Sequence, residues 1–166
     1  MKTDFEMTAT YDDPLDEVEQ FLVDEQILFE RPSEFEIQFS IAGTWCDYPL
    51  WFRWLPNPSL LQIELGIEAK VPQNRHLDVA DLIIQINERL LIGHFDMWKT
   101  DRTLVFRHGQ ILSSGQAPSE TLAKQMSRAA TDAAEVLVPA LNFLLWSEKT
   151  AAQSVEAAMF ETLGEA

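Results

Sequence analysis

An alternation of apolar and polar side chains between residues 34 and 68 constrains this fold more than any other sequence feature. Every second residue is apolar in two segments, which carry Phe35, Ile37, Phe39 and Ile41, then Leu61, Ile63, Leu65 and Ile67. This period of two is typical of antiparallel strands with one face on a core. Tyr48–Leu55, between them, has Tyr48, Leu50, Phe52 and Trp54 in phase but also Trp51 on the opposite face. The sequence therefore predicts three consecutive antiparallel strands.

Helices are predicted on both sides of these strands, where apolar residues recur every three or four positions. Pro14 opens the first helix, and the second begins near Asp78 and ends at Gly93 as a left-handed cap. A long helix begins near Ser119 and has on its inner side Leu122, Met126, Ala129, Ala133, Val136 and Leu137. Pro139 either kinks or ends this helix, because its ring displaces the carbonyl four residues earlier.

The order of elements predicts the fold class. Two short strands near residues 94–99 and 103–112 follow the second helix, and a tail helix follows residue 150. Runs of strands punctuated by helices, without strict alternation, are typical of an α+β domain. We expect a flexible acidic arm over residues 1–13 and a single domain over 14–166. Its twisted antiparallel sheet should have about five strands flanked by helices.

Charge restricts the partners. The chain has 27 Asp and Glu against 12 Lys and Arg, a net charge of −15. Such a surface repels phosphate backbones and anionic lipids, so we expect no nucleic-acid or membrane binding. Two interpretations remain open, namely solubility or binding of a basic protein. The chain begins without the apolar segment of a signal peptide, and no uncharged apolar run approaches ~20 residues, so we expect a cytoplasmic protein.

The chemistry of catalysis and of cofactor binding is not evident in the sequence. His76, His94 and His108 lack metal-ligand spacing, and the glycines form no phosphate-binding loop. His94 and His108 are candidates for a facing pair across the last hairpin. Cys46 is a poor nucleophile because the neighbouring Asp47 carboxylate raises the pKa of its thiol. We interpret Cys46 as a small residue at a strand end. The sequence therefore predicts no enzyme, no metal and no cofactor.

Tryptophans give the candidate binding residues. Trp45, Trp51 and Trp54 lie within ten positions, and Trp54 is in phase with the core side of its strand. Trp51 is on the outward face beside Arg53, and aromatic residues and Arg are enriched at protein interfaces. We predict protein binding by Trp45, Trp51 and Arg53. The alternatives for Trp51 are a homodimer contact, a partner contact, or cover by the chain's own arm or tail.

Several segments together resemble the YbjN-type domain family of bacterial proteins, described as sensory transduction regulators, and its alphaproteobacterial branch in particular. The segments are Gly-Thr-Trp-Cys-Asp-Tyr-Pro-Leu-Trp-Phe at 43–52, Lys-Val-Pro at 70–72, Asn-Glu-Arg-Leu-Leu-Ile-Gly-His-Phe-Asp-Met-Trp at 87–98, Phe-Arg-His at 106–108, Val-Pro-Ala-Leu-Asn-Phe-Leu-Leu-Trp at 138–146 and Ala-Met-Phe-Glu-Thr-Leu-Gly-Glu-Ala at 158–166. The resemblance implies a fold similar to type III secretion chaperones, often dimeric. It implies no catalytic residues.

The residues and the resemblance together favour a non-enzymatic protein-binding module, chaperone-like or regulatory, that works as a homodimer. It would hold an extended or helical segment of a partner near Trp51 and Trp45, and its acidic rim would favour basic partners. A different class of function is a small-molecule or signal-sensing domain with a pocket between the sheet and the long helix.

Overall fold

The computed structural model describes residues 13–113 and 115–164 as six strands, four α-helices and a short 3-10 helix. The elements are α1 (Asp16–Asp24), β1 (Phe29–Ser33), β2 (Glu36–Ala42), β3 (Asp47–Leu55), β4 (Leu60–Ile67), η1 (Gln73–Arg75), α2 (His76–Asn87), β5 (His94–Met97), β6 (Leu104–Ile111), α3 (Glu120–Trp146) and α4 (Ala151–Gly164). The predicted α+β class is confirmed.

All six strands form a single antiparallel sheet in the order β1-β2-β3-β4-β6-β5. The strand absent from the sequence prediction is β1, which is at one edge. Its sequence, Phe-Glu-Arg-Pro-Ser, lacks alternation, and its pairing with β2 is irregular between Glu30 and Ser33. Pro32 is tolerated there because an edge strand has one side without a ladder partner.

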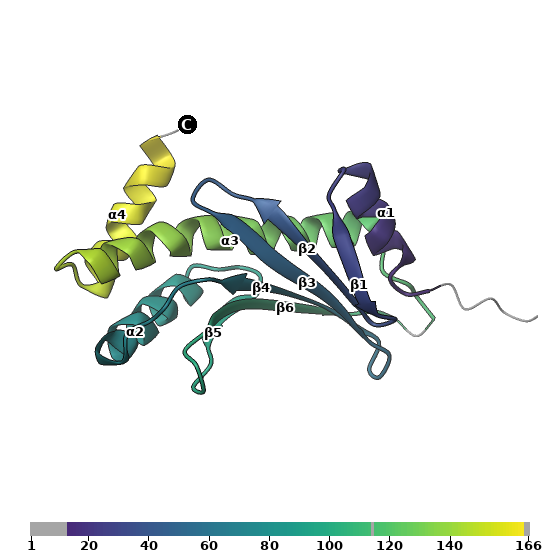
Figure 1. Ribbon diagram of the computed structural model, residues 1–166, viewed down its shortest axis with the longest axis horizontal. Coiled ribbons are helices and arrows are strands. Elements are labelled where there is room, and N and C mark those ends of the chain that lie inside the picture. The colour runs from purple at the N-terminus through teal and green to yellow at the C-terminus, as the bar shows by residue number, and fades with distance from the viewer. Residues whose placement is uncertain (1–12, 114, 165–166) are drawn as a thin grey trace, which may run out of the picture.

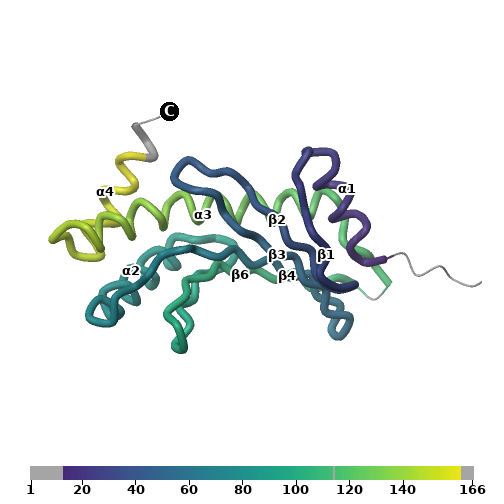
Figure 2. The backbone as a smooth tube through the Cα atoms, in the orientation of Figure 1, coloured from purple at the N-terminus to yellow at the C-terminus, as the bar shows by residue number. Residues whose placement is uncertain are grey.

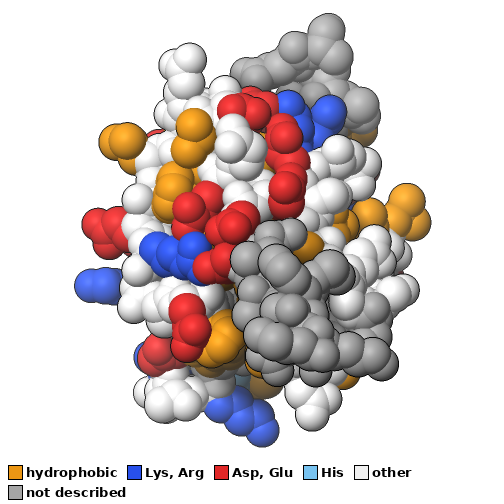
Figure 3. Space-filling view, turned by 90° about the vertical axis from the view of Figure 1, so that its right-hand side faces the viewer, with side chains coloured by type: hydrophobic (Ala, Val, Ile, Leu, Met, Phe, Trp, Pro, Cys, Tyr) orange, Lys and Arg blue, Asp and Glu red, His pale blue; other side chains and the backbone are white. Residues whose placement is uncertain are grey.

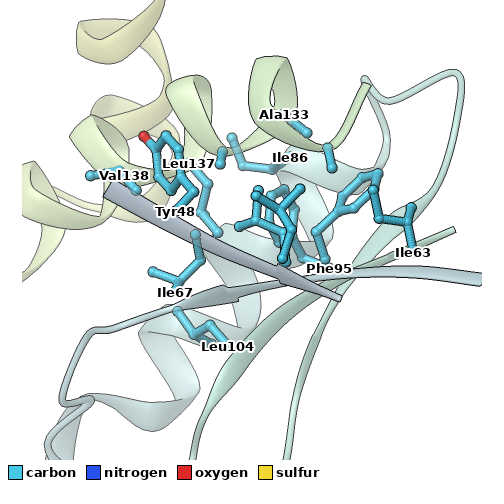
Figure 4. Packing of buried hydrophobic residues seen from close by; sticks show 14 of the residues in the cluster. Tyr48, Ile63, Ile67, Ile86, Phe95, Leu104, Ala133, Leu137 and Val138 are labelled. Atoms are coloured by element: carbon cyan, nitrogen blue, oxygen red, sulfur yellow. The ribbon is translucent and has the colours of Figure 1, made fainter. Parts of the chain in front are cut away.

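The core lies between one face of the sheet, called here the inner face, and helices α3 and α2 (Figure 1). Apolar side chains from the sheet and from the helices point toward one another in Figure 4, where Tyr48, Leu137 and Ile86 are labelled. The in-phase residues of β3 and β4 predicted from the sequence are buried or partly buried here, namely Tyr48, Leu50, Phe52, Trp54, Leu61, Ile63, Leu65 and Ile67. Buried side chains from the sheet and from α3 thus occupy much of the region in which the sensing-domain alternative places its pocket.

Helix α3 runs without interruption through Pro139, which settles whether that residue ends the helix. It begins close to the predicted Ser119, which is its N-cap, and the Ser119 hydroxyl accepts a hydrogen bond from the Leu122 amide at 3.1 Å. The predicted inner residues Met126, Ala133 and Leu137 are buried, whereas Ala130 is buried in place of the predicted Ala129. Alanine contributes little to a hydrophobic pattern, so a run of alanines leaves the phase of the buried face weakly defined.

By length and composition, α3 is apolar enough to cross a membrane. However, 44% of its most apolar window is buried within the protein. The residues of α3 that pack into the core include Met126, Ala134, Leu137 and Leu141. Its apolar character is therefore explained by its position as the core helix of the sheet.

The predicted end of the second helix at Gly93 is wrong. Helix α2 ends at Asn87, with Glu88 as its C-cap. The Asn87 side chain donates to the Phe95 carbonyl at 3.0 Å and accepts from the Phe95 amide at 2.8 Å, which binds the end of α2 to β5. Gly93 does adopt a left-handed φ of +70°, but immediately before β5. Its role is to turn the chain into the sheet.

The first and last helices lie at opposite ends of the molecule (Figure 2). Helix α1 buries Val18, Phe21 and Leu22, and α4 packs against α3 and α2. The predicted arm lies outside the described residues except for Asp13. The Asp13 carboxylate forms an ion pair with Arg31 of β1 and accepts a hydrogen bond from the Leu15 amide at 2.9 Å.

Candidate functional site

Trp51 lies on the outer face of the sheet, away from α3, between Gln38 of β2 and Glu64 of β4. Its indole ring lies over Gly66, because a Cβ built on Gly66 would be 3.2 Å from the ring. Glycine leaves room for an aromatic side chain from the neighbouring strand in this way. The sheet itself therefore covers part of Trp51, which is half-buried.

A shallow groove of about 520 Å³ begins at Trp51, where β1 separates from β2. Its lining residues come from the start of β1 and from β2 and β3, namely Leu28, Phe29, Glu30, Gln38, Phe39, Pro49, Leu50 and Trp51. Leu28, just before β1, is 92% exposed. The groove therefore carries apolar surface on both sides, and none of its lining residues belongs to the tail helix α4.

The edge of β2 is open beside this groove. Pairing with β1 begins at Phe39, so within the described residues Ser40–Ala42 are paired with β3 alone. In Figure 1 the β2–β3 hairpin extends past the end of β1. The opposite edge of the sheet differs, because Asn87 bonds to β5 there. An uncovered strand edge presents free N–H and C=O groups, to which another strand can pair.

A ladder of alternating charges crosses the outer face next to Trp51. Glu64, only 5% exposed, lies 3.3 Å from Nη1 of Arg53 and 3.4 Å from Nε of Arg107. Arg107 also pairs with Asp96 at 3.2 Å, and Arg53 with Glu36 at 3.3 Å. Neighbours on both sides thus hold the predicted binding residue Arg53 in place.

The structure separates Trp45 from the other two predicted residues. Trp45 is 41% exposed and belongs to the turn between β2 and β3, outside the groove lining. Glu135 of α3 holds this turn, because its carboxylate accepts a hydrogen bond from the Thr44 amide at 2.7 Å. Trp51 and Arg53 share the outer face of β3, whereas Trp45 lies beyond the end of that strand.

The Tyr48 phenol lies beneath the same turn. Its hydroxyl is buried, and no described residue gives it a hydrogen bond of good geometry. Burial, followed by the Glu135 carboxylate, raises the pKa of Tyr48 well above its ordinary value. Partial burial also raises the pKa of the exposed Cys46 thiol, with a smaller contribution from Glu135. Because only the thiolate is a good nucleophile, this raised pKa agrees with the interpretation of Cys46 as a residue at a strand end.

The expected facing pair of His94 and His108 is wrong, since His94 is opposite Arg107. Successive residues of a strand point to opposite faces, so His108 is on the inner side, whereas His94 pairs with Asp96 at 3.3 Å. Burial, with a smaller effect of His94, lowers the pKa of His108 from its ordinary value of 6.5. No group of three His, Cys, Asp or Glu in the described part of the chain could hold a metal ion.

We expect His108 to make the protein less stable in mild acid. Because its pKa is lower in the folded chain, the unfolded chain binds more protons once the pH falls below about 6.5. The melting temperature should therefore fall between about pH 7.5 and about pH 5.5, and it should fall less in His108→Gln. Calorimetry at both pH values measures this, and an equal fall in both proteins would contradict it.

Comparisons with known proteins agree with the fold. The family described as "Putative bacterial sensory transduction regulator", YbjN, matches residues 14–143. A solved structure, "Crystal structure of YbjN, a putative transcription regulator from E. coli", is similar with a TM-score of 0.51 and 15% identity, over 75% of this chain and 87% of that one. At that identity the similarity concerns the fold alone. No curated protein sequence matches the chain. The family match covers most of the chain, from the start of α1 into the last turns of α3, and the chain belongs to the YbjN family.

Proposed function

We propose that the chain is a non-enzymatic regulatory module that binds an extended segment of a partner protein. The segment would lie in the groove between Leu28 and Trp51 and pair with the open edge of β2 at Ser40–Ala42. The observation that carries this proposal is an apolar groove next to a stretch of β2 that has no partner on the β1 side among the described residues. Backbone hydrogen bonds would supply affinity, and the groove would accept alternate side chains of the segment.

Charge favours a basic or neutral partner. Glu30 lines the groove, Glu36 is the first residue of β2, and the whole chain carries a charge of −15. Figure 3 shows acidic side chains interspersed with basic ones at the end of the molecule that faces right in Figure 1. A second copy would bring the same charge to the groove. The predicted homodimer remains a proposal that the variants below also test.

A regulatory role fits binding to a protein better than binding to DNA. Proteins that bind DNA neutralise its phosphates with Lys and Arg. This chain has fewer than half as many basic residues as acidic ones, 12 against 27. We therefore propose that any effect on transcription passes through a protein partner.

Leu28→Asp should abolish binding of the partner without affecting the fold. Leu28 is almost fully exposed, so the substitution places a charge in the groove and breaks no core contact. Trp51→Glu is less suitable, because a second carboxylate directly opposite Glu64 would destabilise the sheet. The measurement is quantitative co-purification from the native bacterium, with light scattering of the purified proteins.

Leu91→Asp is the matched control, since Leu91 is also an exposed leucine outside a helix or strand, at 99%. The proposal predicts one protein recovered with the wild type and Leu91→Asp and lost with Leu28→Asp. Equal recovery with all three proteins would contradict the groove as the site. If the wild type and Leu91→Asp are dimers and Leu28→Asp is a monomer, the groove binds a second copy of the chain rather than a different protein.

A further inference from the structure

A second pocket, of about 370 Å³, lies between the start of α2 and the turn that joins β5 to β6. It is lined by Gln73, His76, Met97, Trp98, Lys99 and Arg102. None of these is acidic, although acidic residues outnumber basic ones 27 to 12 in the chain. We propose that this pocket binds a small organic phosphate with a planar ring, the chemistry of a nucleoside monophosphate.

Three side chains of the pocket can bind the phosphate. Lys99 is exposed and has no ion-pair partner among the described residues. Arg102 also lines the pocket and donates its Nε hydrogen to the Val71 carbonyl at 2.9 Å, a bond that does not use its two terminal nitrogens, which can donate to phosphate oxygens. Nδ1 of His76 donates to the Gln73 carbonyl at 2.6 Å, so Nε2 can accept a hydrogen bond from a protonated phosphate oxygen or, when the ring is charged, donate one to it.

The turn between β5 and β6 fixes these groups next to one another. The Arg102 amide donates to the Trp98 carbonyl at 2.8 Å, and the Trp98 amide to the Thr103 carbonyl at 2.9 Å. Arg102 has a left-handed φ of +61°, an unfavourable conformation for a residue with a Cβ. Asp101, in the same turn, accepts a hydrogen bond from the Thr103 amide at 3.0 Å and does not line the pocket. Strained backbone conformations cluster at ligand sites, which agrees with a binding role for Arg102.

The remaining wall suits a planar ring. Trp98 is 45% exposed beside Met97, and indole rings stack on nucleobases irrespective of sequence. The Gln73 amide can both donate to and accept from the edge of a base. Helix α2 begins at His76, so the positive end of its dipole adds to the attraction for a phosphate. The pocket volume is within the range of small-molecule sites, about 300–1,000 Å³.

This site is independent of the protein-binding groove. The groove involves β1, β2 and β3, whereas the pocket is beside β5 at the other edge of the sheet. A ligand here would supply the signal to a regulator that acts through its groove. Either site can be disproved without affecting the other.

The experiment is isothermal titration of the full chain with AMP and with GMP, and with adenosine and inorganic phosphate as partial ligands. We expect at least one nucleotide to bind more tightly than either partial ligand. Lys99→Gln should raise the Kd roughly tenfold, the effect of one charge-assisted hydrogen bond. Lys149→Gln, at another exposed lysine outside a helix or strand, should leave the Kd unchanged. Arg102→Gln should weaken binding at least as much as Lys99→Gln.

Four results would overturn the proposal. They are no heat of binding with either nucleotide, adenosine binding as tightly as AMP, the same Kd for Lys99→Gln as for the wild type, and tighter binding of a single-stranded oligonucleotide than of either mononucleotide. The last would assign the pocket to a nucleic acid. Among the described residues the Lys99 side chain forms no hydrogen bond, so Lys99→Gln should fold like the wild type, and circular dichroism checks this.

Discussion

Gly93→Ala is expected to lower the free energy of unfolding by about 3 kcal/mol. Two effects add. Gly93 has a φ of +70°, where a residue with a Cβ is disfavoured by roughly 1–2 kcal/mol. The added Cβ would also lie 2.2 Å from Cζ of Phe106 and 2.9 Å from the Arg107 carbonyl oxygen. Phe106 is fully buried against Phe95, with ring centroids 5.4 Å apart, so it has little room to move. Urea denaturation measures the loss.

Gly115→Ala separates the two effects. Gly115 has a similar φ of +79°, but a Cβ there would have nothing within 4 Å. Its replacement should cost only about 1 kcal/mol. Phe106→Leu removes the ring atoms that clash, so Gly93→Ala should cost less in that background than in the wild type. Equal losses for Gly93→Ala and Gly115→Ala would contradict the close packing of the turn on Phe106.

Glu64→Ala is expected to cost about 2 kcal/mol, between the values of an exposed ion pair and of a buried one broken on one side. Glu64 is almost completely buried and lies between the guanidinium groups of Arg53 and Arg107. Both arginines are partly exposed, so water offsets some of the loss. The measurement is again urea denaturation, repeated at high salt.

Glu36→Ala is the control for this ladder of charges. Glu36 also pairs with Arg53, at 3.3 Å, but at the end of the ladder and with more exposure to water. Its removal should cost less than about 1 kcal/mol. An equal effect of the two substitutions would show that Glu64 is not the centre of the ladder. Loss of Glu64 should also leave Arg53, which lies on the same face as Trp51, paired with Glu36 alone.

The sequence predicts those parts of the fold whose patterns are local. Strands β2, β3 and β4 follow from their alternation, and the face of Trp51 follows from its phase with Leu50 and Phe52. Strand β1 has no such alternation, and its position depends on pairing with β2 and on the Arg31 contacts to Asp13 and Glu19. The sheet therefore has one more strand than the sequence indicates.

The candidate site could be predicted only in part for the same reason. Trp51 and Arg53 are found on one face of β3, as expected from a period of two. The groove itself depends on where β1 separates from β2, and Leu28 gave no local signal of its exposure. Trp45 lies outside the groove, in a turn held by a hydrogen bond from the Thr44 amide to Glu135, which is 91 residues farther along the chain than Thr44. Contacts at such separation leave no periodic pattern in the sequence.

Site-specific photo-crosslinking in native cells tests the protein-binding groove most directly. A photoreactive amino acid would replace Leu28 in one protein and Leu91 in the other, two exposed positions of similar character. The proposed function predicts a discrete adduct with one partner protein from position 28, with the crosslink mapped to an extended segment, and no such adduct from position 91. Identical adducts from both positions, or none from position 28, would contradict a partner in this groove.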